Sequence, residues 1–126
     1  MKGCRSYGLA VDSTSGHVYA AEYERNHVSH IKVIDPTTGT SVRTFGDECK
    51  STGSYMKNPL SLALDAHGNL LVADCDNDRI VVFNAADGSY ITHFKTPRNP
   101  LSVIVDESGN VIVSCWDKYK NPLMVW

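Results

Sequence analysis

The sequence predicts an all-β fold, built from three consecutive antiparallel meanders. Three observations carry this prediction: the chain repeats itself, each repeat holds about four short apolar runs, and turn residues separate those runs. No stretch shows the 3.6-residue periodicity of an amphipathic helix. We therefore expect about eleven or twelve strands, in sheets that fan around a common axis.

The repeat is anchored by an aspartate that is followed, three or four residues later, by a glycine. Asp65 and Asp106 are 41 residues apart. Asp12 and Asp65 are 53 residues apart, because extra residues occur near positions 25–29 and 46–57. Self-similarity of this kind indicates stacked supersecondary units.

The second unit shows the strand pattern most clearly. Its apolar runs cover residues 60–64, 70–73, 80–83 and 90–94. The turn after the first run, at residues 65–69, is an Asp-x-x-Gly cluster, which suits a tight hairpin because glycine tolerates positive φ and aspartate bonds its own backbone. The first two runs are almost continuously apolar, which predicts that these strands are covered on both faces.

Four-stranded units with a period of about 40 residues are typical of β-propeller blades. We expect one domain over residues 1–126, with blades at about 7–46, 57–95 and 98–126. A WD-type propeller is the nearest alternative, since a Trp-Asp dipeptide begins at Trp116. That dipeptide follows the second strand of its unit instead of the third, so we discount it.

The second unit also resembles an NHL repeat. The matching positions are Pro59, Ala63, Asp65, Gly68, Asn69, Val72, Ala73, Asp74, Asn77, Arg79, Ile80, Phe83, Asp87 and Gly88. The match is partial in the other two units, where Glu22 and Cys115 replace the aspartate equivalent to Asp74. The resemblance implies an incomplete propeller of NHL type, with too few blades to close a ring.

The composition argues against a surface that attracts nucleic acid or membrane. Twelve basic and 14 acidic residues give a net charge of −2, so no broad positive field is present. The N-terminus lacks the apolar segment of a secretory signal, and the sequence has no Asn-x-Ser/Thr acceptor. Four widely spaced cysteines favour thiols in a reducing compartment. We therefore expect a cytoplasmic location.

The connections of a meander alternate between the two ends of its sheet. With strands named A to D from the axis outwards, the B–C loops and the D–A connections share one end, which we call the loop face. Both insertions fall there, and binding residues usually lie in such loops. The candidate interaction residues follow strand B in each unit and are Tyr23, Glu24, Arg25, Cys75, Asp76, Asn77, Trp116, Asp117 and Lys118.

Two interpretations of the loop face stay open. On the first, these residues form a partly acidic rim for a basic peptide or a cation, with Tyr23 and Trp116 as anchors, because exposed aromatic residues dominate interfaces. On the second, Glu22 and Asp74 accept hydrogen bonds within their own blades, and the others are turn residues. Trp116 could equally pack between blades.

The architecture favours a non-catalytic interaction module whose loop face binds a protein or peptide. RNA is less favoured as a ligand, because acidic residues recur at Glu24, Asp76 and Asp117. We expect no cofactor and no membrane association. Three blades are fewer than the usual four to eight, so we expect either a homodimer that completes a six-bladed ring or the remainder of a longer chain. In the dimer, residues 1–6 would donate an outer strand to the partner's last blade.

The alternative is part of an NHL-like propeller enzyme, a metal-dependent lyase or a lactonase-type hydrolase. The resemblance implies metal ligands around the central channel, where this sequence places only Tyr7, Asn58 and Asn99. His27 and His30 are three apart, so in a strand they point to opposite faces and do not favour a shared metal. A zinc site built from the four cysteines lacks the usual local spacing.

Overall fold

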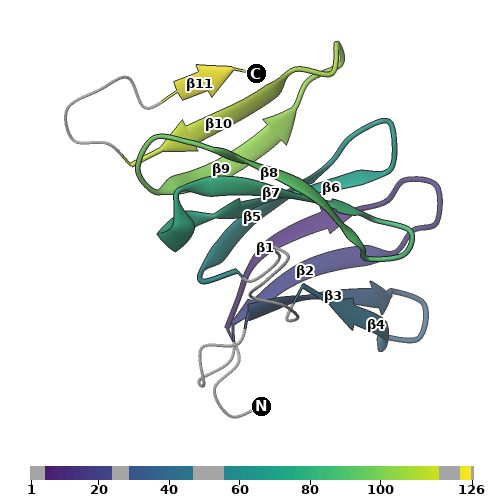
Figure 1. Cartoon of the computed structure of the whole chain (residues 1–126). Coiled ribbons are helices and arrows are strands. Elements are labelled where there is room, and N and C mark those ends of the chain that lie inside the picture. Colours follow the sequence, from purple (N-terminus) through teal and green to yellow (C-terminus); the bar gives the residue numbers. More distant parts are fainter. Residues whose placement is uncertain (1–4, 24–28, 47–55, 117–122, 126) are drawn as a thin grey trace.

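The computed structural model describes residues 5–23, 29–46, 56–116 and 123–125, which form three antiparallel sheets (Figure 1). The described part contains eleven strands and one short 3-10 helix, which confirms the predicted all-β fold. Each sheet pairs its strands in chain order, so each sheet is a meander and corresponds to one blade.

The first blade contains β1 (Arg5–Val11), β2 (Val18–Tyr23), β3 (Ser29–Asp35) and β4 (Thr40–Phe45). Its first strand begins two residues earlier than expected, because Arg5 pairs with Tyr23 and Ser6 pairs with Glu22. The expectation that residues 1–6 supply an outer strand to a partner is therefore wrong for Arg5 and Ser6. Their strand pairing is already made within their own sheet.

The second blade contains β5 (Pro59–Leu64), β6 (Asn69–Asp74), β7 (Arg79–Asn84) and β8 (Tyr90–Lys95), with the 3-10 helix η1 (Cys75–Asn77) between β6 and β7. The third blade contains β9 (Pro100–Val105), β10 (Val111–Cys115) and β11 (Leu123–Val125). All four apolar runs of the second unit are strands, and each strand extends the predicted run by one or two residues.

Aspartate and glycine close the A–B hairpins as the sequence predicts. In the second blade, Asp65 Oδ1 accepts the backbone N–H groups of His67 and Asn69, both at 2.9 Å, and Oδ2 accepts the Asn69 side-chain amide at 2.8 Å. Gly68 has φ of 80°, in the left-handed region that glycine adopts without strain. Asp106 makes the same three contacts in the third blade.

The inner strands β1, β5 and β9 are neighbours across the sheets, so the three blades fan from a common side (Figure 1). β1 and β5 approach each other closely at Gly8, where a Cβ would lie 2.9 Å from the Leu60 carbonyl oxygen. A residue with a side chain at this position would push the two inner strands apart.

Two apolar clusters hold the blades together, one on each flank of the central blade. The cluster between the first and second blades contains Tyr19, Ala21, Ile31, Val33, Phe45, Met56, Leu62, Leu70, Val72, Val81, Phe83 and Ala85. The cluster between the second and third blades contains Leu71, Ala73, Ile80, Val82, Val103, Val113 and Cys115. Alternate residues of β6 and β7 enter opposite clusters, as the two-residue period of a strand requires.

The first two strands of the unit, β5 and β6, each contribute residues to both clusters. In β5, Leu62 lies in the cluster toward the first blade, and Ala63 packs against the cluster toward the third. The prediction that the first two strands of the unit are covered on both faces is therefore correct, although β5 is less deeply buried than β6. β5 is less deeply buried because it is the edge strand on the inner side of the fan, whereas β6 and β7 lie in the middle of the blade.

Candidate interaction face

The connections lie at two ends of the blades, as expected for meanders. Figure 1 shows η1 and the β8–β9 connection at one end, which is the loop face, and the A–B hairpin turns at the other end. Of the nine candidate residues, the structure describes Tyr23, Cys75, Asp76, Asn77 and Trp116. The other four, Glu24, Arg25, Asp117 and Lys118, lie outside the described residues.

Asp74 ties the loop face of the second blade together. Its side chain is fully buried. One carboxylate oxygen accepts the backbone N–H groups of Lys57 and Asn58, at 2.9 and 3.3 Å. The other accepts the Asn77 amide at 2.8 Å and forms an ion pair with Arg79 Nε at 2.9 Å. Asp74 therefore links the D–A connection, η1 and β7, which is the structural role that the second interpretation gave it.

Cys75 lies beneath the surface of the loop face. Its side chain is buried, and burial, together with the negative charges of Asp76, Asp78 and Asp74, raises the pKa of the thiol to about 11. The thiol therefore stays protonated at neutral pH, which makes it a poor nucleophile. Asp76 is exposed beside it, and Asn77 is half-buried and donates to Asp74.

Backbone contacts fix the position of Trp116. Asp78, which ends η1 with φ of 51°, accepts the backbone N–H of Asn99 at 2.7 Å. The carbonyl of Asn99 then accepts the backbone N–H of Trp116 at 2.9 Å. One blade earlier, the carbonyl of Asn58 accepts the N–H of Cys75 at 3.0 Å in the same way. The residue that follows strand B is thus held by the preceding D–A connection in both blades.

The aromatic residues of the loop face differ in exposure. Trp116 occupies the position equivalent to Cys75, yet 67% of its surface is exposed. Tyr23, at the same position in the first blade, is half-buried and engaged in further contacts. Of the two open placements for Trp116, the structure favours the exposed one over packing between blades.

In the first blade, Glu22 forms a charged cluster with two residues of β3. Its carboxylate contacts His30 Nε2 at 3.1 Å and Lys32 Nζ at 3.4 Å. Glu22 thus contacts neighbours within its own blade, as the second interpretation expected. His30 and Lys32 were not predicted as partners of Glu22, although the repeat alignment places both on the strand opposite strand B.

The described residues offer no group of three or more His, Cys, Asp or Glu side chains that could hold a metal. Cys75 and Cys115 are both buried thiols and are not joined to each other. The other members of the four-cysteine set lie outside the described residues, as does His27.

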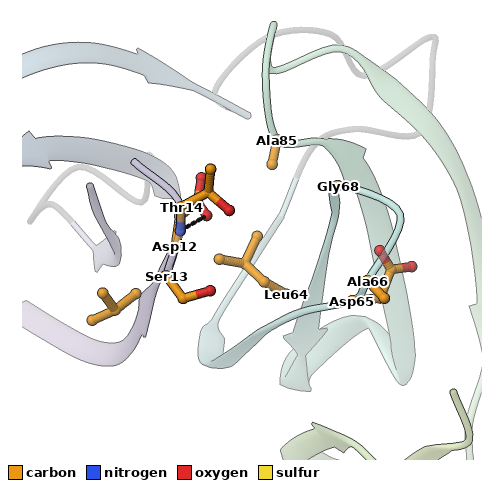
Figure 2. A pocket seen from close by; sticks show the side chains of 9 residues that line it. Asp12, Ser13, Thr14, Leu64, Asp65, Ala66, Gly68 and Ala85 are labelled. Carbon is orange, nitrogen blue, oxygen red and sulfur yellow. Dashed lines mark hydrogen bonds between the residues drawn. The ribbon is translucent and has the colours of Figure 1, made fainter. Parts of the chain in front are cut away.

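A cleft lies at the opposite end of the blades, between the A–B turns of the first and second blades (Figure 2). Its volume is about 430 Å³, and its lining comprises Val11, Asp12, Ser13, Thr14, Leu64, Asp65, Ala66, Gly68 and Ala85. None of the predicted interaction residues borders it. From the sequence, these turns were expected to have only a structural role. A cleft between them could not be predicted, because it depends on how two blades are spaced.

The turn carboxylates at this end are engaged by their own hairpins. The backbone N–H of Thr14 and the Ser15 hydroxyl lower the pKa of Asp12. Burial raises the pKa of Asp65, but hydrogen bonds from Asn69 and His67 outweigh burial and leave it below its ordinary value. The side chain and backbone of Asn110 lower the pKa of Asp106. These groups are ionised at neutral pH, and their acceptor sites serve the turns.

Acid is expected to destabilise the blades through these turns. A carboxyl group whose pKa is lower in the folded state contributes stability above its unfolded-state pKa, near 4, and loses it as the pH falls through the folded value. The urea midpoint should therefore fall between about pH 4 and pH 2. Asp65→Asn should make this decline shallower, whereas an unchanged acid profile in that variant would contradict the assignment.

The sequence of the central blade matches a known family. Residues 56–83 match the NHL repeat family model. The second blade is an NHL repeat. The match covers β5, β6, η1 and most of β7, which are the elements that carry Asp74 and the A–B hairpin. No curated protein sequence matches the chain significantly.

Several solved structures share the arrangement of the NHL-like blades. Hydrazine synthase from Kuenenia stuttgartiensis superimposes with a TM-score of 0.76 at 15% identity, over 95% of this chain and 32% of that one. A Bacteroides caccae protein of unknown function has a TM-score of 0.66 at 15% identity, over 100% and 47%. A chain of a nidogen–laminin complex has a TM-score of 0.66 at 19% identity, over 90% and 40%.

These likenesses establish the fold, an NHL-like run of β-propeller blades. The chain spans between about a third and a half of the length of each of these structures. Within its described part, no helix has the length and apolar character needed to cross a membrane.

Proposed function

We propose that the chain is a non-catalytic interaction module that binds a protein or peptide through its loop face, with Trp116 as the anchor. The observation that carries this proposal is an exposed tryptophan on a backbone that two blades hold in place. Tryptophan is among the residues that most often dominate the energy of interfaces.

A fixed anchor binds at a lower entropic cost than a flexible one. The backbone of Trp116 does not need to become ordered when a ligand binds. Its N–H already donates to the Asn99 carbonyl, and the N–H of Asn99 donates to the Asp78 carboxylate. Preorganisation of this kind reduces the free energy lost when a complex forms.

The surroundings of the anchor favour a ligand with basic residues. Asp76 is exposed on the neighbouring B–C loop, and the chain as a whole carries a net charge of −2. A peptide with a basic side chain beside an apolar one would complement these two features. RNA is disfavoured by the same negative charge, because its phosphates require a positive surface.

The test is a peptide selection followed by affinity measurements. A random peptide library is selected on the immobilised chain, and the best peptide is titrated by calorimetry against the wild type and Trp116→Ala. We expect Trp116→Ala to weaken binding by about 30-fold or more, the effect of removing a hot-spot side chain. The exposed position of Trp116 means that the variant should unfold at the same urea concentration as the wild type.

The matched controls lie on the opposite end of the blades. His67→Ala and Glu107→Ala alter exposed turn residues and should leave the affinity unchanged. If these controls weaken binding and Trp116→Ala does not, the ligand binds at the hairpin end, and the loop-face proposal is wrong.

A further inference from the structure

The first and third blades each expose an apolar flank. On the first blade, Leu9 and Val11 of β1 are 68% and 60% exposed. On the third blade, Ile104 of β9 and Val125 of β11 are 54% and 61% exposed. These are large side chains on regular strands, and exposed apolar faces of this kind mark interaction surfaces.

The open flank of the first blade is equivalent to the side of the second blade that packs against the first blade. Its apolar residues are Leu9, Val11, Val18 and Ile34, which the pairings of β1, β2 and β3 place on one face. The ion pair of Lys32 and Glu22 lies on the same face. The same register positions in the second blade are Leu62, Leu64, Leu70 and Phe83. Those four pack in, or against, the cluster that joins the second blade to the first.

The flank of the third blade corresponds to the other side of the central blade. Cross-strand pairing places Ile104, Ile112 and Val125 on this flank. The same register positions in the second blade are Ala63, Leu71 and Val82. Those residues pack in, or against, the cluster that joins the second blade to the third. The two open flanks are therefore the two complementary halves of one blade-to-blade interface.

We propose that the 126-residue chain forms a two-fold dimer in which the first blade of each copy packs against the third blade of the other. The two equivalent contacts continue the blade-to-blade packing of the chain and close a ring of six blades. A head-to-tail contact whose rotation closes gives a finite assembly instead of a filament. A second copy is the occupant because each copy carries both halves of the interface, so one partner covers both flanks.

A polar contact specifies the register of this packing. Between the second and third blades, the Ser61 hydroxyl accepts the backbone N–H of Val103 at 3.1 Å. Ser102 occupies the position of Ser61 in the third blade and is exposed, and Leu9 occupies the position of Val103 in the first blade. In the dimer, Ser102 of one copy would accept the N–H of Leu9 from the other.

The test is sedimentation equilibrium of the purified chain and of two flank variants. The wild type should sediment at twice the 13.9 kDa chain mass. Leu9→Asp and Ile104→Asp each place a charge on an interface that must lose water, and each should raise the dimer dissociation constant by about 30-fold or more. Both positions are exposed within one chain, so circular dichroism should show that the variants keep their β-sheet content.

Ile91→Asp is the matched control, because Ile91 is 48% exposed on the outer strand of the central blade, away from both flanks. This variant should remain dimeric. Mixing Leu9→Asp with Ile104→Asp should restore dimers, because the mixed pair contains one contact made of two unaltered flanks.

Three outcomes would overturn the proposal. A monomeric wild type would show that something other than a second copy covers the flanks, such as further blades of a longer protein. A variant that stays dimeric while the other does not would indicate a contact between identical flanks. A mass that grows steadily with concentration would show that the ring does not close.

Discussion

Replacing Asp74 by alanine is expected to lower the free energy of unfolding by about 3–5 kcal/mol, the cost of removing one partner from a buried ion pair. The carboxylate is fully buried and accepts four hydrogen bonds. Without it, the backbone N–H groups of Lys57 and Asn58 and the guanidinium of Arg79 lose their shared acceptor. Urea unfolding followed by circular dichroism measures the loss, at one protein concentration so that any association is held constant.

Asp106→Ala serves as the control for this prediction. Asp106 also accepts three hydrogen bonds, but it lies in a hairpin turn where water can replace the lost acceptor. We expect a loss of about 1 kcal/mol there. Similar losses in the two variants would show that the buried contacts of Asp74 do not stabilise the fold more than an ordinary turn.

Phe83→Ala is expected to destabilise the chain by about 3–5 kcal/mol, since it removes a large buried side chain and leaves a cavity. Phe83 is fully buried in the cluster between the first and second blades. Its ring meets the ring of Phe45 edge-on, with centroids 5.3 Å apart. Because this cluster joins two sheets, hydrogen exchange should quicken in the strands of both blades.

Ile91→Ala is the control for the cavity, because Ile91 is an exposed apolar residue of the same blade. We expect its effect to stay within about 0.5 kcal/mol. If Phe83→Ala accelerates exchange only in the second blade, the cluster does not couple the two blades in the way that the packing indicates.

The candidate site was predicted in part. The loop face follows from the alternation of a meander, which the repeat alignment already contained, so the ends of the blades could be assigned in advance. The exposure of Trp116 and the burial of Cys75 could not be predicted from the sequence, because both residues occupy the same position of the repeat. Their difference depends on what each neighbouring blade places over them.

The sequence by itself determined the strands, their order and their turns. These features depend on local chemistry: apolar runs form strands, and aspartate with glycine closes the hairpins within five residues of chain. Only the tertiary structure decided that Asp74 joins three segments, that a cleft opens between two turns, and that β6 and β7 are the most deeply buried strands of the second blade. Each of these depends on how blades pack against one another, which no single repeat encodes.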